Sequence, residues 1–294
     1  MKKKSGKVLF ILIFLILLGI FTYSGIRLFT YYSSANAADD NYQELSQLRQ
    51  EAQTAPVDPT APSRDLSVYE TMSHQELTDL HDSPYIGVTH PETGKSTYLL
   101  PEYEELFLLN PDIVGWISIP DTRIDYPVVQ RSNERDYYLY RAFYGNESQW
   151  GCIYVREECD VFTPSDNVVI YGHRMLDGAM FFDLSNYERY SYWESHPIVR
   201  FDTIRGHHEY EIVCVMKISA NANSAYSFHL FSDAANEAEF NEFWENCKAK
   251  ALYDTGLEVH YGDKLISLYT CEYSQANGRL VVVARRITPD EEGS

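Results

Sequence analysis

The sequence predicts a mostly β domain, folded as a compact and largely antiparallel sheet or barrel. From Gly115 onward the chain contains short runs rich in β-branched and aromatic residues, separated by turn residues at close spacing, a pattern typical of small all-β domains. The runs are WISIP, IDYPVVQ, GCIYV, NVVIYG, IVRFDT, EYEIVCVMKI, KLISLYTC and RLVVVARR. The 24 tyrosines suit strands with half-buried faces, and 294 residues suffice for one large domain or two small ones.

The N-terminal segment predicts a membrane anchor. The basic stretch KKKSGK at 2–7 precedes 19 residues without a charge, at 8–26, which is about the span of a hydrocarbon core. A cleaved secretory signal has a shorter apolar region and a small-residue cleavage site, and neither fits here. Four lysines precede the run and only Arg27 follows it closely, so the N-terminus is expected in the cytoplasm and residues 33–294 outside.

Between the anchor and the β runs the sequence predicts a stalk and a helical region. The segment TAPVDPTAPS at 54–63 has three prolines and predicts a stiff, extended spacer, and residues 39–53 suit a short helix. Helical spacing recurs in YETMSHQELTDLHDS and in PEYEELFLLNPDI at 101–113, where the helix is expected to stop before Pro111.

One helical insertion interrupts the β runs, at residues 231–256. Its apolar residues recur at helical spacing, with Phe243 and Cys247 among them, so Cys247 is expected on a packed helix face. Ser232 or Asp233 is expected to cap its start and Gly256 to end it.

Composition excludes several function classes. A net charge of −19 argues against a nucleic-acid partner, and neither GxGxxG nor GxxxxGK[ST] occurs. The five cysteines include no CxxC pair, and the histidines lack metal-ligand spacing, so neither a metal nor another cofactor is expected. Cys152 and Cys159 are open to either reading, a local disulfide or two separate thiols. His207 and His208, in a predicted hairpin turn, are expected to be exposed.

The end of the chain predicts reactive chemistry. LISLYTC ends on Cys271, a polar loop follows, and RLVVVARR begins at Arg279, so the two runs are expected to pair antiparallel. If Cys271 lies opposite Arg279, then Tyr269 faces Val281 on the same side of the sheet. A fixed positive charge beside a thiol favours the reactive thiolate, and it stabilises the oxyanion formed when that thiolate attacks a carbonyl.

A cysteine nucleophile also needs a proton donor for its leaving group. The segment DNVVIYGHRM supplies His173 just past an apolar run that predicts a central strand. Gly172 is expected to allow an unusual backbone turn there, which places a titratable group at a strand end.

These motifs together resemble the class B sortases. The resemblance rests on SDNVVIYGHRM, DGAMFFDLSNY, LYTCEY and GRLVVVARR, and on the stretch NPDIVGWISIPDTRIDYPVVQ at 110–130. It implies an eight-stranded β-barrel with N-terminal helices and a helical insertion between the sixth and seventh strands. The sequence departs from the family pattern at Arg174, where Asn is frequent, and at Tyr269, where Ser is frequent.

The resemblance implies a membrane-anchored cysteine transpeptidase of the Gram-positive cell surface. It implies that Cys271 attacks a sorting signal after Thr, that His173 acts as acid and base, and that Arg279 holds substrate and oxyanion. The implied partners are surface proteins bearing the signal and an amine of peptidoglycan or of its lipid-linked precursor. The positions near the family's substrate-contact segments are Leu139, Tyr226, Tyr269 and Glu272.

The expected order is a cytoplasmic tail at 1–7, an anchor at 8–26, a stalk at 27–64, an N-terminal helical region at 65–110, the catalytic barrel at 111–288 and a tail at 289–294. Three alternatives stay open at this point. They are a pilin-polymerising sortase, a thiol peptidase that releases acid, and a non-enzymatic surface binding module in which Cys271 is structural.

Overall fold

The computed structural model describes residues 2–54, 86–91, 94, 96–219, 226–272 and 277–288. The chain divides into two compact units, Met1–Asn41 and Tyr42–Ser294.

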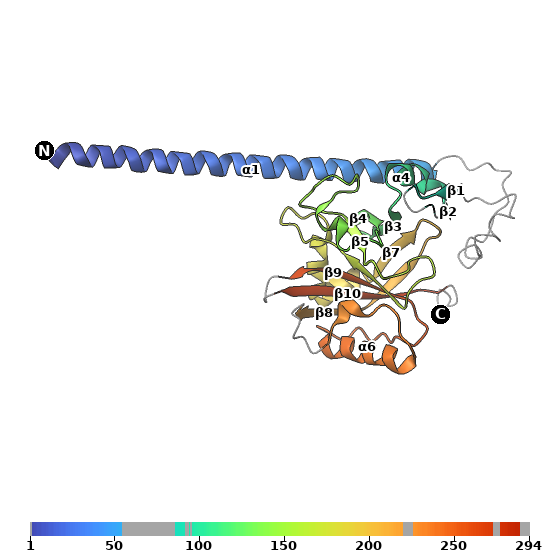
Figure 1. Ribbon diagram of the computed structural model, residues 1–294. Helices are drawn as coiled ribbons and strands as arrows, with labels where there is room; N and C mark the ends of the chain where they lie inside the picture. Colours follow the sequence, from blue (N-terminus) through green and yellow to red (C-terminus); the bar gives the residue numbers. More distant parts are fainter. Residues whose placement is uncertain are drawn as a thin grey trace. The chain divides into compact units, whose positions relative to one another are not determined.

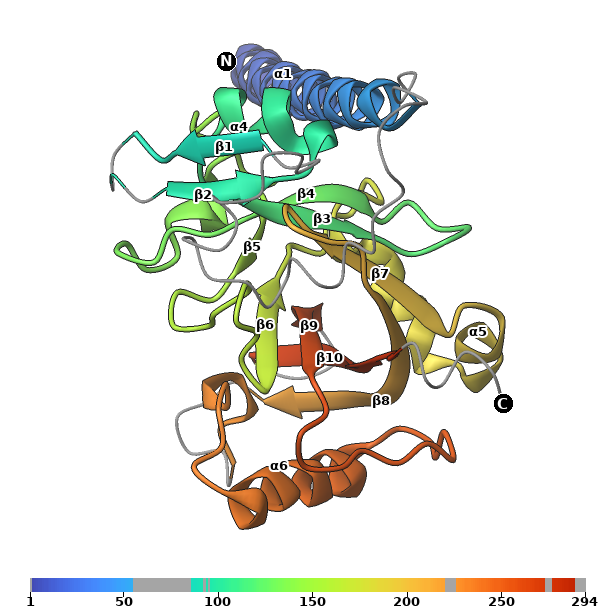
Figure 2. The ribbon, with the colours of Figure 1, turned by 90° about the vertical axis from the view of Figure 1, so that its right-hand side faces the viewer.

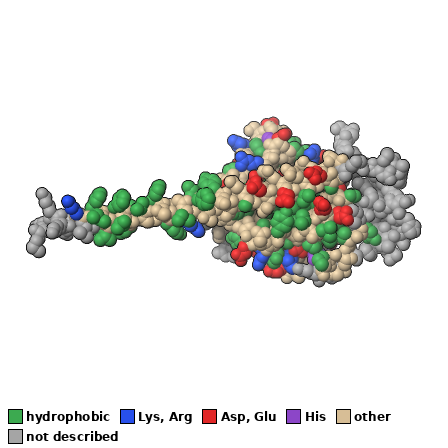
Figure 3. Space-filling view, turned by 90° about the horizontal axis from the view of Figure 1, so that it is seen from above, with side chains coloured by type: hydrophobic (Ala, Val, Ile, Leu, Met, Phe, Trp, Pro, Cys, Tyr) green, Lys and Arg blue, Asp and Glu red, His purple; other side chains and the backbone are tan. Residues whose placement is uncertain are grey.

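The first unit is helical. It belongs to helix α1 (Lys2–Thr54), whose most apolar part is long enough to cross a membrane and is not buried. Phe10 and Phe21 are 71% and 77% exposed, and Figure 3 shows hydrophobic side chains along this helix. By length and composition, the helix is a candidate membrane span.

The second unit is built on a closed β-barrel (Figures 1 and 2). Its strands are β3 (Ile113–Ser118), β4 (Asp125–Val129), β5 (Ile153–Val155), β6 (Asn167–Tyr171), β7 (Ile198–Thr203), β8 (Glu209–Ser219), β9 (Leu265–Glu272) and β10 (Gly278–Arg286). Their order around the barrel is β10-β8-β7-β3-β4-β5-β6-β9, and β9 pairs with β10 to close it. Each strand coincides with one of the eight β runs of the sequence, which confirms the predicted eight-stranded barrel.

Two of the strand pairings are parallel, β4 with β5 and β6 with β9, and the others are antiparallel. The first four residues of β6 are buried, because this strand lies inside the barrel wall between β5 and β9. Burial of both faces explains why NVVIY is a continuous apolar run rather than an alternating one.

The remaining elements surround the barrel. They are β1 (Ile86–Thr89), β2 (Ser96–Leu99), η1 (Pro101–Tyr103), α4 (Glu104–Leu109), η2 (Tyr137–Tyr140), η3 (Phe181–Glu188), α5 (Tyr190–Ser195), η4 (Phe228–Leu230) and α6 (Glu237–Lys250), where η denotes a 3-10 helix. Strands β1 and β2 form an antiparallel hairpin inside the region predicted to be helical, whereas α4 agrees with the helix predicted before Pro111. The helix predicted in YETMSHQELTDLHDS lies outside the described residues.

In the chain, helix α6 follows β8 and precedes β9, the sixth and seventh strands of the barrel, as expected, and Figure 2 shows it beside β8. Its predicted ends were wrong. Asn236 caps the start by accepting a hydrogen bond from the Glu239 amide at 3.2 Å, because Asp233 is engaged by the Ser165 hydroxyl at 2.9 Å. The helix stops at Lys250 rather than at Gly256, because Ala251 forms an isolated bridge with Met216 of β8.

The cysteines other than Cys271 are buried free thiols. Cys152 and Cys159 are separate, since their sulfur atoms approach the carbonyls of Pro127 at 4.0 Å and Asn167 at 3.7 Å. The structure therefore favours two separate thiols over a local disulfide. Cys247 lies on the packed face of α6, as predicted, and its carbonyl accepts from the Cys214 thiol of β8 at 3.5 Å.

The end of helix α1 belongs to the second unit and packs on the barrel. Leu45 is fully buried, the Ser46 hydroxyl donates to Asp125 at 2.8 Å, and Arg49 forms an ion pair with Asp202 of β7. The expected helix at 39–53 is present as the end of α1. The extended spacer predicted at 54–63 lies, beyond Thr54, outside the described residues.

A charged cluster reinforces this contact. His207 places Nδ1 3.2 Å from Asp202 and Nε2 3.1 Å from Glu102, so both ring nitrogens face carboxylates. Hydrogen bonds to Asp202 and then Glu102 raise the pKa of His207 to about 10, although burial opposes the shift.

The expectation of an exposed His208 was wrong. Its backbone pairs with Phe201, and its ring is buried with Nδ1 2.7 Å from the Arg286 guanidinium.

We expect Phe243→Ala to lower the free energy of unfolding by about 3–5 kcal/mol. Phe243 is fully buried and stacks on Phe231 with ring centroids 4.1 Å apart, so truncation leaves a cavity between α6 and the barrel. Denaturant unfolding of the purified chain measures the change, with exposed Glu242→Ala as the control. Equal stabilities of the two variants would contradict the packing described here.

The His207 cluster predicts a pH dependence of stability. Because the folded pKa lies above the ordinary value of 6.5, the stabilisation is complete below about pH 6.5 and is lost as the pH rises towards 10. The side chain is 47% exposed, so the loss is about 1 kcal/mol or less. Unfolding from pH 6 to 10 should show a smaller decline in His207→Gln than in the wild type or in exposed His260→Gln. Parallel curves for all three proteins would refute this assignment.

Candidate active site

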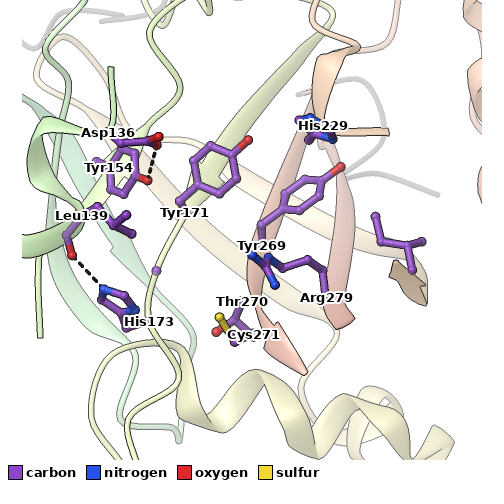
Figure 4. A pocket seen from close by; sticks show the side chains of 12 residues that line it. Asp136, Leu139, Tyr154, Tyr171, His173, His229, Tyr269, Thr270, Cys271 and Arg279 are labelled. Carbon is purple, nitrogen blue, oxygen red and sulfur yellow. Dashed lines mark hydrogen bonds between the residues drawn. The ribbon is translucent and has the colours of Figure 1, made fainter. Parts of the chain in front are cut away.

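A cavity of about 270 Å³ lies at one end of the barrel (Figure 4). The residues predicted for chemistry, Cys271, His173 and Arg279, all line it. Of the predicted substrate contacts, Leu139 and Tyr269 also line it. The lining side chains come from five strands, β5, β6, β8, β9 and β10, and from η2, η4 and the segments beside them.

The β9–β10 hairpin positions the thiol and the guanidinium. Its register places Cys271 opposite Arg279 and Tyr269 opposite Val281, as predicted. Tyr269 is buried, whereas Cys271, two residues further along β9, is partly exposed where the strand reaches the cavity. The Arg279 guanidinium donates to the carbonyl of Gly278 at 2.9 Å, which holds it near the start of β10.

The parallel pairing of β6 with β9 positions the imidazole. Tyr171 of β6 lies opposite Tyr269 of β9, and the Gly172 amide donates to the Tyr269 carbonyl at 3.1 Å. In a parallel pair both strands advance in the same direction, so His173 and Cys271 each follow this pair by two residues at the same edge. In the view of Figure 4, Cys271 lies between His173 and Arg279.

Gly172 has a different role from the one predicted. Its backbone does not adopt the left-handed conformation that an unusual turn requires. A Cβ atom at this position would lie 2.5 Å from both Ile153 Cδ1 and Phe181 Cδ2, so glycine is needed for close packing beneath His173.

The backbone around His173 fixes its ring. Nε2 donates to the Leu139 carbonyl at 2.7 Å, and because a carbonyl only accepts, Nε2 carries a proton. In the neutral ring, Nδ1 is then the nitrogen that can take up a proton. Tyr140 packs beside the ring at a centroid distance of 5.5 Å, and the Phe181 amide donates to the His173 carbonyl at 2.9 Å.

Tyrosines form one wall of the cavity. The rings of Tyr154 and Tyr171 lie 5.3 Å apart, those of Tyr171 and Tyr269 lie 5.6 Å apart, and the Tyr154 hydroxyl donates to Asp136 at 2.9 Å. The Tyr269 hydroxyl is buried without a hydrogen-bond partner among the described residues. Burial raises the pKa of Tyr154, Tyr171 and Tyr269, so these three tyrosines stay uncharged.

Several lining residues were missed by sequence reasoning. They are Asp136, Tyr154, Tyr171, Ile218, His229 and Thr270. Tyr171 and Thr270 lie within the motifs that contain His173 and Cys271, whereas the other four come from segments that only barrel closure brings together and that no local motif marks. Burial, together with Arg156 and other nearby arginines, lowers the pKa of His229 and so favours its neutral form. Arg279 is the arginine that lines the cavity.

The other two predicted substrate contacts are not placed in the cavity by the described residues. Tyr226 packs on Phe228 with ring centroids 4.8 Å apart, and the side chain of Glu272 lies outside the described part of the chain. Within that described part, no group of three or more His, Cys, Asp and Glu side chains is arranged to hold a metal ion.

Together these groups suit acyl transfer. A partly exposed thiol provides a nucleophile, an imidazole nitrogen provides a proton relay, and a guanidinium opposite the thiol provides a positive charge for an oxyanion.

Comparisons with known proteins agree with this chemistry. The family model "Sortase domain" matches residues 117–287. Sortase B of Staphylococcus aureus is 30% identical over 65% of this chain and 76% of its own length. Sortase B of Listeria monocytogenes is 28% identical over 76% of this chain and 89% of its own length.

A solved structure of sortase B complexed with triglycine superposes with a TM-score of 0.65 at 25% identity, covering 87% of this chain and 99% of that chain. The match of the family model over more than half of the sequence and the barrel topology lead to one assignment. The chain belongs to the sortase family, as a class B sortase, and is a cysteine transpeptidase of surface-protein sorting.

Proposed function

We propose that this protein cleaves a sorting signal of surface proteins after Thr and transfers the acyl group to an amine of cell-wall peptidoglycan. The observation that carries the proposal is the strand register, which sets Cys271 opposite Arg279 and brings His173 to the same barrel edge. One short segment of substrate can therefore contact all three groups.

In the first half-reaction the Cys271 thiolate attacks the Thr carbonyl carbon and forms a C–S bond. The resulting oxyanion is stabilised by Arg279, whose guanidinium stays protonated and offers several donors. When the tetrahedral intermediate collapses, the C–N bond breaks and protonated Nδ1 of His173 gives its proton to the leaving amine. The products are a thioacyl enzyme and the free C-terminal fragment.

The second half-reaction reverses these roles. The acceptor amine attacks the thioester carbonyl and loses a proton to Nδ1 of His173. Collapse breaks the C–S bond, which restores the Cys271 thiolate and leaves a new amide. The sortase B structure complexed with triglycine supports a glycine-type amine as the acceptor class.

The tyrosine wall suggests how the cavity receives the peptide. The wall is aromatic, and Leu139 also lines the cavity, so we propose that the cavity takes the signal residues preceding Thr. We propose Tyr226 and Glu272 as further substrate contacts, on the family resemblance alone.

We also propose the location of the enzyme. Residues 8–26 anchor it as a single membrane span with residues 1–7 in the cytoplasm, and the catalytic barrel of residues 111–288 is extracellular. The charge asymmetry around the apolar segment supports this orientation. An anchored enzyme of this kind acts on substrates that reach the same membrane surface.

The purified full chain in detergent should cleave one or more peptides of the NPxTx, LPxTx or related types after Thr. With a glycine-type amine present it should form the amide product, and Cys271→Ala and His173→Gln should lose both activities. His260→Gln, which alters an exposed histidine outside the cavity, should retain them. Mass spectrometry identifies the products.

Acid as the sole product, with every amine tested, would favour a thiol peptidase, and preference for a lysine side chain would favour a pilin-polymerising enzyme. Cleavage that persists in Cys271→Ala would sink the proposed mechanism.

Arg279→Lys should lower kcat by about 10²–10³-fold, because lysine keeps the charge but lacks the planar set of donors. KM should change much less, since the lost interaction is proposed to form with the oxyanion. Steady-state kinetics tests this against Arg200→Lys, which alters an exposed ion pair on β7. A rise in KM at unchanged kcat would instead assign Arg279 to substrate binding alone.

A further inference from the structure

The carbonyl that orients His173 is supported from behind by a short loop, here called the 148–152 segment. Leu139, whose carbonyl accepts from His173, lies between two residues held by this segment. The Ser148 amide donates to the Tyr140 carbonyl at 2.9 Å, and the Cys152 amide donates to the Tyr138 carbonyl at 3.0 Å. The position of the 148–152 segment therefore sets the position of the Leu139 carbonyl.

Gly151 makes the closest contact within this support. Its φ of +61° lies in the left-handed region, and a Cβ at this residue would come within 2.5 Å of the Leu139 carbonyl oxygen. Backbone is thus packed directly on backbone, with no flexible side chain between them. A shift of Gly151 is passed to Leu139 and so to the ring of His173.

Helix α1 holds Gly151 in place through Tyr42. The Tyr42 hydroxyl donates to the Gly151 carbonyl at 2.8 Å, and the residue is 6% exposed. Burial raises the pKa of Tyr42, so the hydroxyl keeps its proton and remains a donor. Removing it would leave a buried carbonyl without this partner.

The ring of Tyr42 also supports the loop that follows His173 in the chain. It packs edge-on against Tyr126, with centroids 5.3 Å apart at 88°, and the Tyr126 hydroxyl accepts from the Met180 amide at 3.0 Å. Met180 has a φ of +58°, which is unusual for a residue with a side chain, and it precedes Phe181, whose amide donates to the His173 carbonyl.

We propose that Tyr42 is a positioning residue for His173, so that the docked end of helix α1 forms part of the catalytic machinery. The inference rests on the proposed acid and base role of His173. Tyr42 does not line the cavity, and it acts through two routes. Its hydroxyl supports the Leu139 carbonyl through Gly151, and its ring supports the loop after His173 through Tyr126 and Met180.

A positioning role predicts a specific kinetic signature. A small displacement of a catalytic group lowers the rate of the chemical step more than it weakens substrate binding. Tyr42→Phe removes the hydroxyl but keeps the ring, and should lower kcat by roughly 10-fold. Tyr42→Ala removes both routes and should lower it further. KM should change by less than about 2-fold in Tyr42→Phe.

The matched control is Ser46→Ala, one turn further along the same helix. It deletes a hydrogen bond of the same length, from Ser46 to Asp125, and leaves in place both the hydrogen bond from Tyr42 to Gly151 and the ring contact of Tyr42 with Tyr126. The full-length chain in detergent is assayed for kcat, KM and the pH profile of kcat, and melting temperatures are measured alongside. The rate of Cys271 alkylation by iodoacetamide against pH gives a readout that needs no substrate.

The inference is supported if Tyr42→Phe lowers kcat and shifts the pH profiles of kcat and alkylation, while Ser46→Ala leaves all of these within 2-fold of the wild type. It is overturned if Tyr42→Phe lowers only the melting temperature. It is also overturned if Tyr42→Phe and Ser46→Ala have the same kcat and the same pH profiles. If His173→Gln retains wild-type activity, the proposed function has failed, whereas an essential His173 with an indifferent Tyr42 removes this inference alone. If no peptide is turned over, the alkylation profile decides between the same outcomes.

Discussion

The parallel pairing of β6 with β9 is the constraint on which the site depends. Because Tyr171 lies opposite Tyr269, the residues that follow each strand end at the same edge of the barrel. The antiparallel pairing of β9 with β10 then adds Arg279 directly opposite Cys271. Backbone pairing of three strands therefore brings together three side chains separated by up to 106 positions in the sequence. A register shift of one residue in either pair would turn one of these groups to the other face.

The surroundings keep the histidine in one orientation. Gly172 lets Ile153 and Phe181 pack against the backbone next to His173, and the Leu139 carbonyl fixes which ring nitrogen carries a proton. Cys271 remains partly exposed while the other four cysteines are buried. Burial raises the pKa of Cys152 and Cys214 to about 12, so these thiols are poor nucleophiles at neutral pH. Access and neighbours, rather than residue type, distinguish Cys271 from the other thiols.

Much of the fold was predictable because its signals are local. The eight strands follow β-branched runs, and the register of Cys271 with Arg279 follows from one short loop between two strands. The helix predicted at 231–256 was found, but its caps were misplaced, since Asp233 binds Ser165 and bridge formation at Ala251 ends the helix. The hairpin at 86–99 and the packed end of α1 were missed. Both depend on tertiary contacts that overrule local composition.

The candidate site was predictable only in part. Cys271, His173 and Arg279 were placed by motifs, while Asp136, Tyr154 and His229 reach the cavity only once the barrel closes. The intact mass of the full-length chain, recorded during reaction with a cleaved sorting peptide, tests the central claim most directly. The account predicts an acyl adduct that maps to Cys271, is absent in Cys271→Ala, and disappears when a glycine-type amine is added. Turnover without any adduct on Cys271 would contradict it.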